Sequence, residues 1–207
     1  MKQLYSLLAG ALFLCSSAFG SDEAPDVMVK RVTDEVLTIV RADKDIQAGN
    51  SKKAIELVEA KVLPHFNFTR MTALAVGKDW NKATPEQKKQ LAKEFETLLV
   101  RTYSNALTAY KSQTVVYKPL KMQPGDTDVL VRTEIRQPGQ QAVQLDYGVE
   151  KQDNGWKVYD VVVAGISLVT NYRENFAAEV RAGGIDGLIA SISAKNKQIA
   201  TAHADKK

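Results

Sequence analysis

Apolar residues recur at steps of three and four through the first half of the chain, the spacing that collects them on one face of a helix. The first such stripe joins Val29, Val32, Val36 and Val40 and ends before Gly49. Similar stripes follow it, and the pattern predicts four helices, over 25–48, 51–62, 67–77 and 85–110.

The start of the longest predicted helix is marked by the segment Thr84-Pro85-Glu86-Gln87. A threonine followed by proline at the first helical position and glutamine three residues later forms a capping box. Asn67 is a suitable N-cap for the shorter helix before it. Both helix starts are therefore expected at defined residues.

Beyond Lys111 the period changes from 3.6 to 2, which is typical of half-buried strands. Turn-forming pairs such as Pro138-Gly139 and Asn154-Gly155 separate the alternating segments, so the strands should form an antiparallel meander with one apolar face. We expect strands over 114–118, 128–136, 143–150 and 156–163, and further helices over 169–180 and 187–193. This order predicts one α+β domain, with helices packed on one face of a curved antiparallel sheet.

The first 20 residues are predicted to be a signal peptide that is removed on export. Lys2 supplies the positive charge, residues 4–14 form the apolar stretch, and cleavage is expected ahead of Ser21. Cys15 is not expected to carry a lipid anchor, because the residue before it is Leu14 rather than a small one.

The expected mature chain consists of a single domain over 21–200 and a disordered tail over 201–207. It contains no cysteine, so its stability must come from the core rather than from disulfides. The full chain carries 28 basic and 24 acidic side chains. Because the basic residues do not gather on one element, no nucleic-acid partner is expected.

Catalytic chemistry has few candidates in this sequence. His203 lies in the predicted tail and His65 in a helix–helix connection, so neither is placed to activate Ser167, which follows the strand–glycine turn at Gly165. No metal-binding or phosphate-binding motif is present, and no cofactor is expected. A helix-capping or ligand-contacting role is the favoured interpretation of Ser167.

An acid–base pocket built from Asp146 and Asp160 is the alternative, and it would make the protein a small hydrolase or isomerase. Strand alternation directs Asp146 away from the apolar face that Tyr147 joins. Asp160 is less settled; by the same alternation Tyr159 shares a face with Val161. A third possibility is an adaptor that binds only proteins and whose apolar stripes are ordinary core.

The longest informative segment is 156–176, with the sequence WKVYDVVVAGISLVTNYRENF. A strand breaks at Gly165 and helical spacing resumes from Ile166. The segment resembles the signature of the periplasmic MlaC family, also called the toluene-tolerance family. Segments 62–71, 77–87 and 95–103 resemble the same family, with Asn67 in place of its usual aspartate.

The resemblance implies a non-catalytic carrier that moves phospholipid between the two membranes of a Gram-negative cell. It implies an NTF2-like cone whose apolar cavity holds the acyl chains, with Arg173 at the mouth as a phosphate or partner contact. The expected partners are an outer-membrane lipoprotein–porin complex and an inner-membrane ABC transporter complex, and the expected state is a periplasmic monomer. We expect the chamber to be lined by Val76, Trp80, Leu98, Tyr103, Tyr110, Leu145, Tyr147, Val149, Val161, Val163, Ile166, Leu168 and Tyr172.

Overall fold

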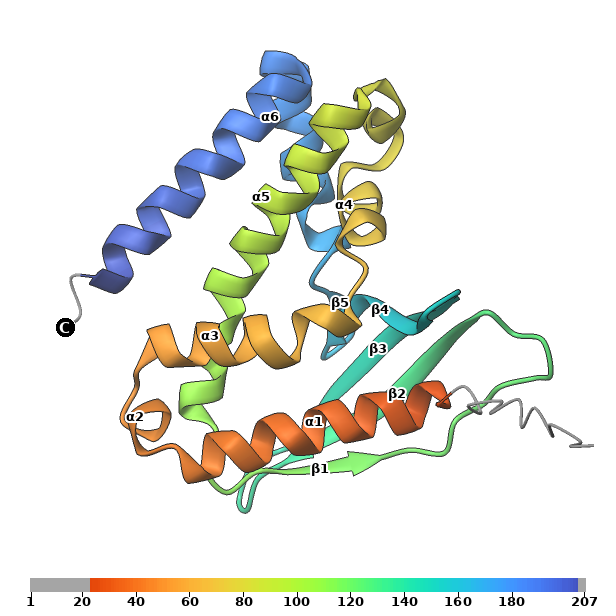
Figure 1. Ribbon diagram of the computed structural model, residues 1–207, viewed down its shortest axis with the longest axis vertical. Helices are drawn as coiled ribbons and strands as arrows, with labels where there is room; N and C mark the ends of the chain where they lie inside the picture. The colour runs from red at the N-terminus through yellow and green to blue at the C-terminus, as the bar shows by residue number, and fades with distance from the viewer. Residues whose placement is uncertain (1–22, 205–207) are drawn as a thin grey trace, which may run out of the picture.

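The computed structural model describes residues 23–204, and Figure 1 shows the course of the chain. The expected signal peptide, its cleavage site and Cys15 lie outside the described residues. The described part contains six α-helices: α1 (Pro25–Ala42), α2 (Lys44–Gln47), α3 (Ser51–Lys61), α4 (Phe68–Val76), α5 (Pro85–Tyr103) and α6 (Arg173–Ala204). It also contains four short 3-10 helices: η1 (Leu63–His65), η2 (Gly77–Lys82), η3 (Ser104–Ala109) and η4 (Thr170–Tyr172).

One antiparallel sheet follows the first five helices in sequence, and its five strands lie in sequence order. They are β1 (Thr114–Tyr117), β2 (Asp128–Arg136), β3 (Val143–Gln152), β4 (Gly155–Val163) and β5 (Ile166–Ser167). The α+β class and the antiparallel meander predicted from the sequence are therefore confirmed.

Three predicted helix boundaries differ from the structure. The first helix stops at Ala42 because Asp43 caps α2. The Asp43 carboxylate accepts hydrogen bonds from the backbone N–H groups of Asp45 and Ile46. The long helix becomes a 3-10 helix after Tyr103. The C-terminal helices form one element through Ala204, broken at Gly184, where φ is 67°. Residues 201–204, expected to be disordered, are helical, and 205–207 lie outside the described part.

The sequence suggested that the strand before Gly165 leads directly into a helix, but in the structure it does not. Ala164 and Gly165 have φ of 50° and 83°, and they form a two-residue turn between Val163 and Ile166, which pair with each other. Positive φ at both central residues matches the twist of a hairpin. The chain therefore adds the short edge strand β5 before η4 begins.

Helix α1 covers the apolar face of the sheet, as the front view in Figure 1 shows. Met28, Val29 and Val32 pack against the strand residues Val131 and Val149. Each of these five residues is at most 8% exposed. The alternation predicted for β2 and β3 is thus realised, with one face turned toward a helix.

A β-bulge changes the alternation along β4. Val149 pairs with Val158 but Gly148 pairs with Asp160, so Tyr159 is an extra residue without a partner across the strand pair. The prediction that Tyr159 shares a face with Val161 is therefore wrong. The Tyr159 ring instead lies against Gly148, on the sheet face opposite α1.

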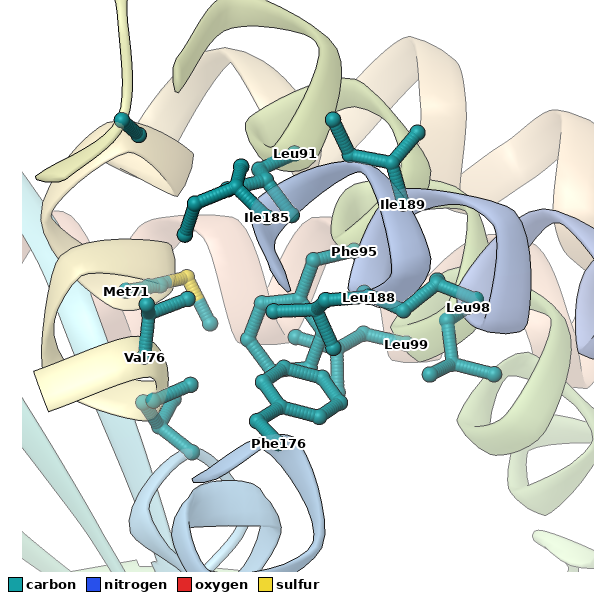
Figure 2. Close-up of a cluster of buried hydrophobic side chains, with 14 residues drawn as sticks. Met71, Val76, Leu91, Phe95, Leu98, Leu99, Phe176, Ile185, Leu188 and Ile189 are labelled. Atoms are coloured by element: carbon teal, nitrogen blue, oxygen red, sulfur yellow. The ribbon is translucent and has the colours of Figure 1, made fainter. Parts of the chain in front are cut away.

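A second core lies among the helices, away from the sheet. Figure 2 shows α5 and α6 side chains meeting around Phe95, which is fully buried. The Phe95 ring meets Tyr172 and Phe176 edge-on, with ring centroids 5.1 and 5.3 Å apart. Residues of α4 such as Met71 and Val76 complete this core. The molecule therefore has a helical half and a sheet half.

A cluster of polar side chains around Arg70 of α4 joins the two halves. Its guanidinium lies 3.6 Å from the centre of the Tyr159 ring and forms ion pairs with Asp128 and Glu150. The Tyr159 hydroxyl donates a 2.6 Å hydrogen bond to Asp128, and Asn67 donates one to Glu150. Asn67 also caps α4, as predicted. The start of α4 is thereby attached to three strands.

Gly148 is required for this arrangement. A Cβ atom at this position would lie 2.9 Å from Cζ of Tyr159. We expect Gly148→Ala to lower the free energy of unfolding by about 1–3 kcal/mol, because the added methyl group would overpack the site and push the Tyr159 ring away from β3. Gly187→Ala is the control: it lies in α6, and its Cβ would have 3.8 Å to the nearest atom. Urea denaturation of both variants measures the difference, and an unchanged Gly148→Ala midpoint would contradict the expectation.

Candidate functional site

A forked apolar cavity lies between the helical half and the sheet half. One branch, of about 390 Å³, runs between α1, η3 and the sheet. The other, of about 290 Å³, runs between α3, α4 and α5. Seven wall residues are shared by both branches, which therefore adjoin: Val36, Val62, Phe66, Tyr103, Leu107, Val161 and Leu168.

The polar atoms of the cavity wall are mostly held by other protein groups. The Tyr110 hydroxyl donates a 2.5 Å hydrogen bond to the Gln113 carbonyl. Tyr147 is paired with the hydroxyl of Thr33, and burial raises the pKa of Tyr147 to about 12. The Ser104 hydroxyl is buried without a hydrogen-bond partner among the described residues. The wall consequently offers mainly carbon to a ligand.

His65 is the one basic residue that lines the cavity within residues 23–204. It is half-buried, so it stands at the rim rather than in the interior. Burial, together with the charges of Arg31 and Lys157, lowers the pKa of His65. An uncharged imidazole at neutral pH fits a wall that is otherwise apolar.

The structure brings half of the predicted chamber residues together in the cavity wall. They come from α5, from the residue after η3, and from β3, β4 and the segment after β5. They are Tyr103, Tyr110, Leu145, Tyr147, Val161, Val163 and Leu168.

The remaining predicted residues lie elsewhere. Val76, Leu98, Trp80 and Tyr172 belong to the helical core. Val149 is fully buried between the sheet and α1. Ile166 is 60% exposed, because the β4–β5 turn carries it to the surface.

Arg173, predicted at the mouth, holds the end of α4 instead. Its guanidinium donates hydrogen bonds of 3.1 and 2.8 Å to the carbonyl of Leu74, and its side chain lies against Gly77. Helix α4 ends at this glycine, where φ is 65°. The arginine thus satisfies a carbonyl that the helix leaves free at its C-terminus.

Sequence reasoning missed the contribution of α1 and of the α3–α4 connection. Val32 and Val36 of α1 line the cavity, as do Phe66 and Phe68, whose rings stack with centroids 5.9 Å apart. The α1 stripe was visible in the sequence, but periodicity cannot distinguish a core face from a cavity wall. The two phenylalanines lie within the family-like segment 62–71 and were not selected.

The catalytic candidates do not converge on the cavity. Ser167 accepts hydrogen bonds from the N–H groups of Val169 and Thr170 and donates one of 2.9 Å to Asp160, so its hydroxyl is engaged by the backbone before η4. Burial raises the pKa of Asp160. Asp146 is only 4% exposed and accepts a hydrogen bond from Gln144 on the sheet face opposite α1.

Residues 23–204 contain no group of three or more His, Cys, Asp or Glu side chains placed to hold a metal ion. Among the helices of the same part, none is long and apolar enough to cross a membrane.

The fold and the cavity define an α+β binding protein with an apolar ligand chamber. The family described as "MlaC protein" matches residues 30–194, so the chain belongs to the MlaC family. A solved structure of the phospholipid-binding protein from Ralstonia solanacearum, in complex with a phospholipid, is 41% identical. It superposes with a TM-score of 0.79, covering 87% of this chain and 99% of that one.

Two curated proteins are similar over nearly their whole lengths. The intermembrane phospholipid transport system binding protein MlaC of Haemophilus influenzae is 24% identical, covering 96% of this chain and 95% of that protein. The toluene tolerance protein ttg2D of Pseudomonas putida is 26% identical, covering 95% of this chain and 96% of that protein. The family resemblance inferred from the sequence is therefore confirmed.

The position of Arg173 gives a prediction that separates structure from ligand binding. We expect Arg173→Met to lower the free energy of unfolding by about 1 kcal/mol, because the Leu74 carbonyl loses its donor. Phospholipid affinity should not change, since the side chain is not in the cavity wall. Arg181→Met, exposed on the same helix, is the control. If Arg173→Met lost phospholipid affinity without a change in its urea denaturation midpoint, Arg173 would be a ligand contact at the cavity mouth.

Proposed function

We propose that this protein is a non-catalytic phospholipid carrier of the periplasm. The forked apolar cavity is the observation that carries the proposal. The 41% identical relative, whose structure contains a phospholipid, supports it because the similarity extends over 87% of this chain. The head group would remain near the surface while the acyl chains fill the cavity.

The two branches suit a ligand with two chains. Tyr103, Val161 and Leu168 stand where the branches adjoin, so one acyl chain would run toward α1 and the sheet and the other between α3, α4 and α5. The two chains of a typical phospholipid hold about 30 methylenes, and exposing them to water would cost on the order of 20–25 kcal/mol. An apolar chamber removes this cost during transit.

Transfer from a membrane into such a cavity is close to an even exchange, because the bilayer already buries the chains. The carrier therefore needs no bound nucleotide, and the direction of transport comes from its partners. We propose that these are an outer-membrane lipoprotein–porin complex and an inner-membrane ABC transporter complex. The name of the Haemophilus influenzae relative, which refers to an intermembrane phospholipid transport system, supports this assignment.

We further propose that residues 21–200 form the lipid-binding unit, released as a monomer after removal of residues 1–20. We also propose that the fold is an NTF2-like cone. It is supported by the sheet with α1 across its apolar face and by the cavity between them.

The direct test is to express the chain with its N-terminal segment and purify it from the periplasm without detergent. Native and denaturing mass spectra are then compared with an organic extract of the same sample. Co-purified phospholipid in near-stoichiometric amount supports a carrier. An empty, folded protein that also takes no lipid from vesicles would favour the protein-only adaptor.

A cavity-filling substitution should abolish loading without unfolding the protein. Val161 lines both branches, so Val161→Trp would occupy the point where they adjoin. We expect phospholipid loading from vesicles to fall at least about tenfold, equivalent to about 1.4 kcal/mol. Val27→Trp, at a valine that is 52% exposed, is the control. Full loading of folded Val161→Trp would show that the lipid lies elsewhere.

A further inference from the structure

The cavity wall between α1 and the end of α3 is crossed by one ion pair. The Lys61 ammonium lies 2.6 Å from the Glu35 carboxylate, and the two side chains are 43% and 41% exposed. Val32 and Val36 flank Glu35 on α1, and Val58 and Val62 flank Lys61 on α3. These valines line the cavity, so the ion pair lies directly outside its wall.

The wall is thin at this place. Val58, Val62 and Leu63 line the cavity and yet are only half-buried. His65, two residues after Leu63, also lines the cavity and is half-buried. Residues that face both a cavity and solvent mark the rim of that cavity. The rim therefore follows the end of α3 and η1, opposite α1.

The part of the chain that follows this segment is fastened much more firmly. Phe66 forms a bridge with Val158, with the Asn67 N–H donating a 2.8 Å hydrogen bond to the Val158 carbonyl. The Arg70 cluster adds ion pairs to two strands. By comparison an exposed ion pair between flexible side chains contributes little to stability. Helix α3 itself is held to α1 and α2 by a buried cluster that includes Val40, Ile46 and Leu57. The Lys61–His65 segment, where it faces the first half of α1, is thus the part of the wall that separates at the lowest cost.

We propose that phospholipid enters and leaves between α1 and the Lys61–His65 segment, and that the Glu35–Lys61 ion pair closes this portal. The inference rests on the proposed carrier function and identifies the surface through which the lipid is exchanged. The rim is polar there: Arg31 and Glu35 come from α1, and the Lys157 ammonium donates a 2.7 Å hydrogen bond to the Pro64 carbonyl. A charged head group can remain hydrated at such a rim while its chains pass the valines.

The test is a charge reversal across the portal. Wild type, Glu35→Lys, Lys61→Glu and the doubly swapped protein are loaded from vesicles of phosphatidylethanolamine and phosphatidylglycerol. Release to acceptor vesicles is then followed in time. Each single reversal should speed release about fivefold, the effect of an exposed pair worth up to about 1 kcal/mol. The double swap should restore the wild-type rate.

Lys53→Glu is the matched control. Lys53 lies on the same helix and pairs with Asp45 at 2.6 Å and with Asp43 at 3.5 Å, but these pairs join α3 to the junction between α1 and α2 and lie away from the proposed portal. Its release rate should equal that of wild type. Added salt should speed release from wild type, where it screens attraction, and slow release from the single reversals, where it screens repulsion.

The outcomes separate this inference from the carrier function itself. A wild-type protein that takes up no phospholipid would overturn both. Normal loading with equal release rates from wild type, both reversals and the swap would overturn the portal alone. Faster release that the double swap fails to restore would also overturn it, because the effect would then come from the individual residues and not from their pairing.

Discussion

The structure depends on holding the apolar surfaces of the helical half and the sheet half apart around the cavity while the two halves stay attached to each other. Apolar side chains of the helical half and of the sheet half would close on each other across the cavity if nothing held the two halves at a distance. The Arg70 cluster supplies that constraint, because it fixes the start of α4 to β2, β3 and β4 on the face opposite α1. The bulge at Tyr159 provides the aromatic surface on which the guanidinium lies.

The chemistry of the wall follows from the same division. Strand positions facing the cavity are mainly valines, and the others are Ile135, Leu145 and Tyr147. Tyr110 and Tyr147 each have a protein partner for their hydroxyl, so neither requires water inside the chamber. A ligand that enters therefore meets carbon, while the charges of Glu35, Lys61 and Lys157 remain at the surface. This separation matches an amphiphile with two apolar chains.

Local signals in the sequence predicted local structure well. The capping box at Thr84 is present, Asn67 caps α4, and the strand alternation of β2 and β3 is realised. Two local features were not predicted, the helix cap at Asp43 and the turn at Ala164 and Gly165. Other predictions were wrong because the residue contacts another part of the chain. The bulge at Tyr159 follows from contact with Gly148, and Arg173 is drawn to the end of α4 by the Leu74 carbonyl, 99 positions away. Leu145, Tyr147, Val161 and Val163 of β3 and β4 were predicted as cavity residues, but Val158 was not. The cavity residues of α1 were not predicted either, because their stripe looks like ordinary core.

A carrier must bind its cargo strongly enough to cross water and weakly enough to release it. The cavity meets the first requirement through apolar area, which is not specific and does not depend on one contact. Release then has to be controlled by how the helices and the sheet are attached to each other, since the loss of one wall contact is not enough to release two acyl chains. A firm attachment at Arg70 and Phe66 and a weak one at Glu35–Lys61 place that control on one side of the molecule. A membrane complex that moves the Lys61–His65 segment away from α1 would need to break one exposed ion pair and separate a row of valines, while the buried cluster that joins α1 to α3 around Val40 and Leu57 stays packed.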